Sequence, residues 1–247
     1  MDKEAPLISF VAPSYDEAEN LPALVEQVAK AGAVIGKPWE LVIVNDASAD
    51  NSAEVLLDLR RKFPQLRIIT MDRRSGQTAA LEAGFRHARG AFIGTLDADL
   101  QNDPAEFPRM LEMVQSGQCD MLTGWRKQRN DKPIRLVSSR LANHFRNWMT
   151  GEKIHDSGCS LKVFRREVAE SFKLFNGLHR FLPALARMNG FRVLEVPVNH
   201  RARTAGVAKY GVWNRLFKAS RDIFALRWMQ ARVLIYRASE VGDDHVG

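Results

Sequence analysis

Cysteine is scarce in this sequence. Cys119 and Cys159 are the two cysteines among 247 residues. Two widely separated cysteines cannot build a disulfide framework, and without a CxxC pair the common structural zinc motifs are excluded. We therefore expect a reducing compartment such as the cytosol, in which free thiols persist.

Long hydrophobic runs are also missing. No apolar stretch reaches the length of a bilayer span, so the sequence predicts a protein that is not integral to a membrane. The N-terminus, MDKEAPLISF, is acidic at its start and lacks the apolar core of a secretory signal.

Two glycine-rich phosphate-binding motifs are absent as well. No GxGxxG follows the first apolar run, as a dinucleotide-binding fold would require, and no GxxxxGK[ST] occurs. If the chain binds a phosphorylated ligand, carboxylates and a divalent cation must take the place of such a cradle.

The composition is that of a globular protein with excess positive charge. Hydrophobic residues make up 45% and charged residues 26%, and the net charge of +7 suggests an anionic partner: nucleic acid, a membrane surface or a phosphorylated substrate. The basic residues cluster after residue 125 and no aromatic RNA-binding motif accompanies them, so we expect no nucleic-acid partner.

The first half of the chain alternates apolar runs with helical segments. Strands are predicted at 7–12, 40–46, 66–71, 91–98 and 119–125, and helices from Asn20 or Pro22 to Gly32, from about Asp50 or Ser52, at 77–88 and at 104–117. Strands that are apolar on both faces and separated by helices indicate an α/β fold, with a mostly parallel sheet covered by helices on both sides.

The second half is more basic. Helices are predicted at 134–149, 163–172 and 181–190, a strand at 191–200, a basic loop at 201–211 and a basic amphipathic segment at 212–237. We divide the chain into a main domain at 1–210 and a basic amphipathic helix with a polar tail at 211–247.

Two aspartates follow the fourth predicted strand. Asp97 and Asp99 are one residue apart, so both should point to the same side of the sheet where the strand ends. Ligands of parallel sheets bind at this edge, and two close carboxylates call for a cation or a proton between them. The pattern DxD arises by chance about once in a chain of this length, and Glu17 or Asp50 could simply cap helices. The three strand ends together, with Glu17, Asp46 and Asp99, favour a Mg²⁺ or Mn²⁺ site for a diphosphate.

Four motifs carry a resemblance to a known family. SFVAPSYDEAENLPALV, VIVNDASADNSAEVL, GQTAALEAGFRHARG and LDADLQNDPAEFPRML resemble family-2 glycosyltransferases of the GT-A fold. The resemblance runs from about Leu7 to Lys209 and is closest to the branch that moves a sugar from a nucleotide onto a polyprenyl phosphate. That branch includes dolichol-phosphate mannose synthase and the undecaprenyl-phosphate glycosyl- and aminoarabinosyltransferases.

The resemblance implies roles for individual residues. It assigns the donor nucleotide to Pro13, Tyr15, Glu17, Val44, Asp46, Asp97, Ala98, Asp99, Arg126, Arg203 and Lys209. It makes Asp99 and Gln101 the ligands of Mg²⁺ or Mn²⁺. It names Asp97, Asp99, Arg126 and Arg140 as catalytic, with Arg140 binding the phosphate of the acceptor. It favours GDP-mannose as donor, although GQTAALEAGF and DSGCSLKVF look closer to the bacterial undecaprenyl-phosphate enzymes.

The implied reaction is inverting transfer of a sugar to a lipid phosphate. A phosphate monoester has a second pKa of about 6, so the nucleophile is ionised at neutral pH and no strong general base is needed.

Alternative functions are transfer from UDP-sugar or aminoarabinose donors, transfer to a glycan acceptor, and nucleotide binding without catalysis. Asp156 either packs or faces the acceptor, and Cys159 is expected to pack.

A membrane-bound acceptor requires the protein to approach a membrane surface. Two segments place aromatic and apolar residues on one helical face: Ile134, Val137, Leu141, Phe145 and Trp148 in the first, and Trp213, Leu216, Phe217, Ile223, Phe224 and Trp228 in the second. Such a face can pack on a core or lie in a membrane interface beside basic residues. We expect a cytoplasmic protein attached peripherally to the cytoplasmic face of the membrane; the sequence does not indicate its oligomeric state.

Overall fold

The computed structural model describes residues 5–127, 154–201, 222–232 and 234. Its elements, in chain order, are β1 Ile8–Ser14, α1 Leu21–Ile35, β2 Trp39–Asn45, α2 Ser52–Lys62, β3 Leu66–Thr70, α3 Gln77–His87, β4 Phe92–Thr95, η1 Pro104–Glu106, α4 Phe107–Gln115, β5 Met121–Trp125, β6 Lys162–Arg165, α6 Arg166–Glu170, η2 Leu178–Phe181, α7 Leu182–Met188 and β7 Val193–Pro197. Residues 222–230 form a further helix.

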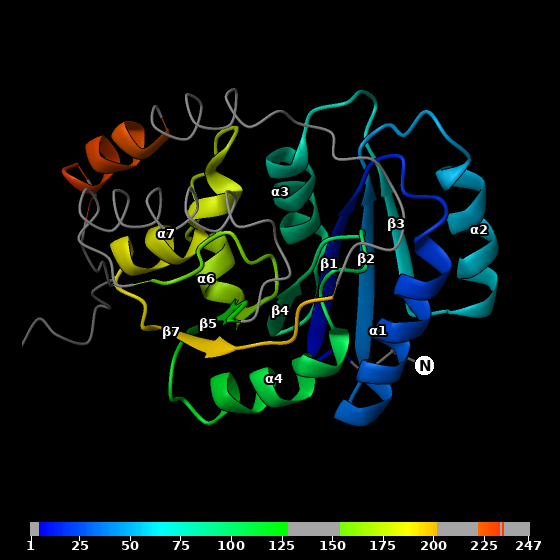
Figure 1. Cartoon of the computed structure of the whole chain (residues 1–247), viewed down its shortest axis with the longest axis horizontal. Helices are drawn as coiled ribbons and strands as arrows, with labels where there is room; N and C mark the ends of the chain where they lie inside the picture. Colours follow the sequence, from blue (N-terminus) through cyan, green and yellow to red (C-terminus); the bar gives the residue numbers. More distant parts are fainter. Residues whose placement is uncertain (1–4, 128–153, 202–221, 233, 235–247) are drawn as a thin grey trace, which may run out of the picture.

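The described strands form one 7-stranded sheet in the order β3-β2-β1-β4-β6-β5-β7 (Figure 1). Neighbouring strands are parallel except at β6, which is antiparallel to both β4 and β5. The α/β prediction of a mostly parallel sheet is confirmed. The carboxyl ends of β1, β2, β4 and β5 therefore lie along one edge of the sheet, the edge from which chain 154–161 enters β6.

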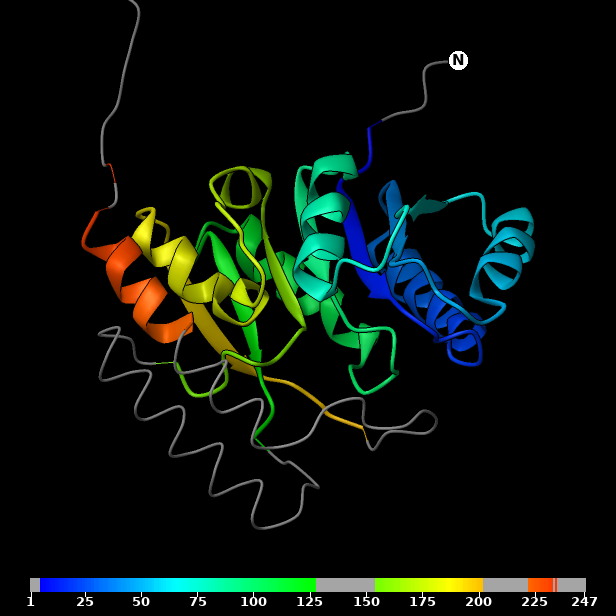
Figure 2. The same ribbon diagram turned by 90° about the horizontal axis from the view of Figure 1, so that it is seen from above.

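Helices cover both faces of the sheet (Figure 2). One core cluster joins the sheet to α1, α2 and α4, and a second joins the opposite face to α3, α6, α7 and the helix at 222–230. Strands buried on both faces explain the continuous apolar runs of the sequence. No helix among the described residues has the length and apolar character needed to cross a membrane.

Three predicted elements differ from the structure. Helix α1 continues past the predicted end at Gly32 and ends before Gly36, whose φ is 65°. Gly32 instead allows close packing, because a Cβ at this position would lie 2.4 Å from the Trp39 ring. The helix predicted at 163–172 is wrong for its first residues, which form β6 beside β4. Strand β4 ends at Thr95, before the predicted end at 98.

Candidate active site

The loops that leave β1, β2 and β4 share an unusual backbone. Asp16, Ala47 and Leu100 are the non-glycine residues with positive φ in the described part of the chain, at 50°, 52° and 61°. This left-handed conformation is unfavourable for residues with a side chain and is found preferentially at ligand sites. All three residues follow the carboxyl ends of parallel strands, where the sequence places the site.

Hydrogen bonds join the loops after β1 and β2. The Ala49 amide donates to Oδ1 of Asp16 at 2.7 Å, and the Asp16 amide donates to Oγ of Ser48 at 3.0 Å. The Ala18 amide donates to Oδ2 of Asp50 at 3.0 Å. The two loops therefore form one unit, and Asp50 ties them together while also accepting from the Ser52 amide at the start of α2.

Asp46 holds the loop that precedes α3. Its two carboxylate oxygens accept the backbone amides of Ser75 and Gly76 at 2.7 and 2.8 Å. The same loop places the guanidinium carbon of Arg74 4.0 Å from the centre of the Tyr15 ring. Asp46 therefore shapes the side of the site that the family resemblance assigns to the nucleotide, and Tyr15 and Arg74 stack beside it.

The remaining residues assigned to the nucleotide divide into two groups. Val44 and Ala98 are 0% and 3% exposed, and their side chains belong to the core clusters. Pro13 and Glu17 are half-buried, and Oε2 of Glu17 accepts a hydrogen bond from Nδ2 of Asn20 at 2.7 Å.

Asp97 is held by partners from distant parts of the chain. Its Oδ1 accepts from Nε2 of Gln77 at 2.8 Å, and its amide donates to Oδ1 of Asn102 at 3.3 Å. The same Asn102 oxygen accepts from Oγ of Ser160 at 2.6 Å. Burial raises the pKa of the Asp97 carboxyl, and the neighbouring Asp99 raises it further, as expected for two close carboxylates.

Asp99 and Gln101 lie in the turn that follows. Oδ1 of Asp99 accepts from the Gln101 amide at 3.2 Å, and Asp99 is 9% exposed. Arg201, after β7, closes the turn, because its amide donates to the Gln101 carbonyl at 2.9 Å and its guanidinium lies 2.7 Å from Asp103. Residues from two ends of the domain therefore fix the geometry of the DxDxQ sequence.

The donor set suits a hard divalent cation that shares its ligands with a substrate. Asp97, Asp99 and Gln101 offer oxygen atoms, which Mg²⁺ and Mn²⁺ prefer. Within the described residues, no three His, Cys, Asp or Glu side chains gather as a complete metal cluster. A cation bound by Asp99 and Gln101 would thus take further oxygens from a diphosphate or from water.

Arg126 extends from the end of β5 into a bidentate ion pair. Its Nε and Nη2 atoms donate to Oδ2 and Oδ1 of Asp156 at 2.7 and 2.9 Å. Burial would lower the pKa of this guanidinium, but the hydrogen bonds and charge of Asp156 raise it. The Asp156 amide donates in turn to Oε1 of Glu195 in β7 at 2.9 Å. The arginine is therefore fully charged and oriented by two acidic residues.

The structure brings part of the predicted site together. Asp97, Asp99, Gln101 and Arg126 follow the ends of β4 and β5 at the same edge of the sheet, with β6 between the two strands. The sequence analysis missed the supporting residues Gln77, Asn102 and Ser160, because their contacts join parts of the chain that are distant in sequence. Three predicted site residues, Arg140, Arg203 and Lys209, lie outside the described residues.

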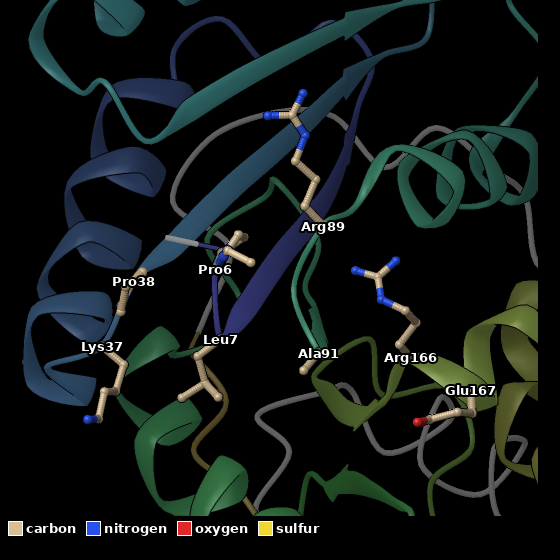
Figure 3. A pocket seen from close by; sticks show the side chains of 9 residues that line it. Pro6, Leu7, Lys37, Pro38, Arg89, Ala91, Arg166 and Glu167 are labelled. Carbon is tan, nitrogen blue, oxygen red and sulfur yellow. The ribbon is translucent and has the colours of Figure 1, made fainter. Parts of the chain in front are cut away.

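The cavity shown in Figure 3 lies elsewhere. It has a volume of about 480 Å³ and is lined by residues such as Leu7, Ala91 and Arg166, which stand at the starts of β1, β4 and α6. This is the opposite edge of the sheet from Asp97 and Asp99. The carboxylate site and this cavity are therefore separate features.

Comparison with known proteins decides the family. The glycosyl transferase family 2 model matches residues 9–172. The chain belongs to glycosyl transferase family 2. The match covers β1 to α6 and so includes the Asp97–Gln101 turn, Arg126 and Asp156.

Similar family 2 proteins include enzymes named for polyprenyl phosphates. A dodecaprenyl-phosphate galacturonate synthase from Rhizobium johnstonii is 39% identical over 226 residues, which are 89% of this chain and 66% of the relative. An undecaprenyl-phosphate 4-deoxy-4-formamido-L-arabinose transferase from Pectobacterium carotovorum is 38% identical over 82% of this chain and 62% of the relative. The chain thus spans somewhat less than two thirds of the length of these curated relatives.

Solved structures confirm the GT-A fold. A mannosyltransferase from Pyrobaculum calidifontis, in complex with GDP-Man and Mn²⁺, has a TM-score of 0.65 at 18% identity, covering 93% of this chain and 65% of that one. Glucosyl-3-phosphoglycerate synthase from Mycobacterium tuberculosis has a TM-score of 0.66 at 14% identity, covering 98% and 85%. At these identities the likeness concerns the fold alone.

Proposed function

We propose that this family 2 chain transfers a sugar from a nucleoside-diphosphate sugar to a polyprenyl phosphate, with inversion at the sugar. The observation that carries the proposal is the position of Asp97 and Asp99 at the end of β4, close to an Arg126 that Asp156 already orients. The 39% identity to a dodecaprenyl-phosphate galacturonate synthase supports a lipid-phosphate acceptor.

The described side chains suit this chemistry. A phosphate oxygen of the acceptor attacks the anomeric carbon, the bond from that carbon to the diphosphate breaks, and the nucleoside diphosphate leaves. A divalent cation, when bound, neutralises the charge that develops on the leaving group. Arg126 adds a planar guanidinium that matches phosphate oxygens. Because the acceptor phosphate is already ionised, the site needs no His–carboxylate base.

The sugar is the open part of the proposal. GDP-mannose, which the sequence favoured, is not confirmed, and the relatives named above act on galacturonate and formamido-arabinose. The aminoarabinose-type alternative therefore fits about as well as GDP-mannose. We keep GDP-mannose, UDP-hexose, UDP-hexuronate and UDP-aminopentose donors as the panel to be tested, with Mg²⁺ or Mn²⁺ as cofactor.

A transfer assay tests the proposal. The protein would be incubated with undecaprenyl phosphate in detergent, each donor of the panel, and Mn²⁺ or Mg²⁺, and the lipid would be analysed by mass spectrometry. One donor should give a glycosyl phospholipid, while undecaprenol without the phosphate should give none. If no donor gives a lipid product and a glycan acceptor is modified instead, the lipid-phosphate proposal is wrong.

We also propose peripheral attachment to the cytoplasmic face of the membrane through the helix at 222–230, part of the predicted segment 211–247. Phe224 and Trp228, one turn apart, are 60% and 62% exposed, and the guanidinium of Arg232 lies 5.1 Å from the Trp228 ring. Aromatic side chains beside cations suit a lipid interface. One predicted membrane contact is wrong: Ile223 is buried and, with Leu226, packs in the core. The first predicted segment, 134–149, and Trp213, Leu216 and Phe217 lie outside the described residues.

A further inference from the structure

Lys162 is a buried cation next to the candidate active site. It is the first residue of β6 and is 2% exposed. In the sheet it stands directly between Thr95 of β4 and Thr123 of β5. Thr95 lies two residues before Asp97, and Thr123 lies three residues before Arg126. Lys162 is therefore on the strand between β4 and β5, close to the edge of the sheet where Asp97 and Arg126 lie.

The side chain of Lys162 points to the same face of the sheet as Asp97. Directly paired residues of neighbouring strands share a face, and alternation along a strand puts Ile93 and Thr95 on that face too. Ile93 and Phe164 belong to the core cluster on the side of α3 and α7. Helix α3 also supplies Gln77, the hydrogen-bond partner of Asp97. Lys162 and Asp97 therefore approach the site from the same side.

Charged groups of both signs surround Lys162. Its Nζ donates to the Cys159 carbonyl, which carries no formal charge. Burial lowers the pKa of the Lys162 ammonium group, and the nearby carboxylates of Asp156 and Asp97 oppose this shift. Arg126 is already committed to Asp156 by two hydrogen bonds. Among the described residues, Lys162 forms no side-chain ion pair, and its charge and that of Asp97 influence each other.

A buried ammonium group is costly to keep. Removing it from water disfavours folding, and a hydrocarbon side chain of similar volume is often neutral or stabilising in such a place. The nearby core packs well with apolar residues, so packing does not require a lysine here. A buried lysine at this position is therefore better explained by the neighbouring site than by packing.

We propose that Lys162 is a positioning residue of the donor site, whose ammonium group interacts with Asp97 and attracts the diphosphate of the donor. This inference rests on the proposed function. The charge of Lys162 should strengthen binding of the anionic diphosphate and weaken binding of the divalent cation. At an effective dielectric constant of about 20, one elementary charge about 12 Å from a charge of the ligand changes affinity by about tenfold.

The test measures binding of UDP and GDP, and separately of Mn²⁺ alone, by calorimetry. Lys162→Gln removes the charge and keeps a donor for the Cys159 carbonyl, Lys162→Arg keeps the charge, and Lys162→Met covers the case in which the glutamine variant fails to fold. Arg165→Met is the matched control, because it removes one positive charge from the same strand at the opposite edge of the sheet, where Arg165 lies 3.6 Å from Asp120.

Lys162→Gln should bind the nucleoside diphosphate about tenfold more weakly and Mn²⁺ at least as tightly as the wild type. Lys162→Arg should keep most of the nucleotide affinity, and Arg165→Met should keep all of it. A merely structural lesion would weaken both ligands together, and that result, or unchanged nucleotide affinity in Lys162→Gln, overturns the inference. A wild type that binds neither UDP nor GDP, with or without Mn²⁺, would instead overturn the proposed function itself.

Discussion

The Arg126 guanidinium and the Asp156 carboxylate form a two-point ion pair, with Nε–Oδ2 and Nη2–Oδ1 distances of 2.7 and 2.9 Å. Glu195 supports it, because Oε2 and Oε1 accept the amides of His155 and Asp156 at 2.8 and 2.9 Å. The orientation of Arg126 is thus fixed by the protein, so a phosphate that binds it loses little conformational entropy in ordering the side chain.

Asp156→Asn should reduce catalytic efficiency more than stability. The amide keeps the shape of the side chain but accepts only one of the two hydrogen bonds and loses the charge. A hydrogen bond to a charged group contributes about 1.5–3 kcal/mol, so kcat/KM for the donor should fall by roughly 10- to 100-fold. Steady-state kinetics and thermal melts measure both effects.

Asp120→Asn is the matched control for this change. Asp120 also accepts from an arginine, with Arg192 Nε 3.3 Å away, but it precedes β5 at the opposite edge. Its variant should keep normal kcat/KM. Equal losses of activity in both variants would show that Asp156 acts through stability alone.

Asp99→Ala should abolish sugar transfer while the protein stays folded. The side chain is the proposed ligand of Mg²⁺ or Mn²⁺, and it accepts a local hydrogen bond from the Gln101 amide. Transfer would be measured at limiting Mn²⁺, with exposed Asp58→Ala on α2 as the control. Near-normal rates in folded Asp99→Ala would contradict the metal assignment.

Local patterns made the first half of the fold predictable. Strands β1 and β2 are apolar on both faces and end in polar residues, so the sequence located both strands and the edge of the sheet at which these polar residues lie. Strand β6 could not be recognised in this way, because KVFR is short and its pairing with β4 depends on a partner far away in the chain. The hydrogen bond from Ser160 to Asn102 could not be predicted either, because these residues are far apart in the chain. In the helix at 222–230, the apolar pattern could not predict that Ile223 is buried while Phe224 is exposed, because tertiary packing decides which apolar side chains face the core.

Stability should fall as the pH drops below about 6.5, in part through His179. Burial lowers its pKa from 6.5 to about 3, with Arg180 and Lys162 adding to the effect. Thr78 Oγ1 accepts from the Gly177 amide, so its proton can point to Nδ1 of His179, 2.7 Å away, and a protonated ring could not accept it. The neutral ring stabilises the fold above 6.5, and this contribution is lost between 6.5 and about 3, at up to about 1.4 kcal/mol per pH unit.

Denaturant titrations at several pH values measure this loss. The difference in unfolding free energy between the wild type and His179→Gln should shrink as the pH falls through the window. His87→Gln, on the exposed end of α3, should follow the wild type at every pH. A constant difference between wild type and His179→Gln would exclude the histidine as the source.

The double variant Phe224→Ser and Trp228→Ser should lose affinity for anionic vesicles without losing stability, because both side chains are largely exposed. Flotation with anionic and neutral vesicles, at low and high salt, measures the binding. Val34→Ser removes a similarly exposed apolar side chain, 74% exposed on α1, and should float like the wild type. Unchanged flotation of the double variant would mean that this helix is not the docking surface.

The reversed strand β6 also has a consequence for the order in which the molecule is made. A nascent chain that has emerged only as far as Trp125 holds β4 with one side paired to β1 and the other without its native neighbour. An open strand edge of this kind invites pairing with other chains. The same later segment that covers this edge also brings Asp156, Ser160 and Lys162 to the site. Synthesis of the segment up to Arg165 therefore ends the exposure of the sheet and assembles the surroundings of Asp97 in one event.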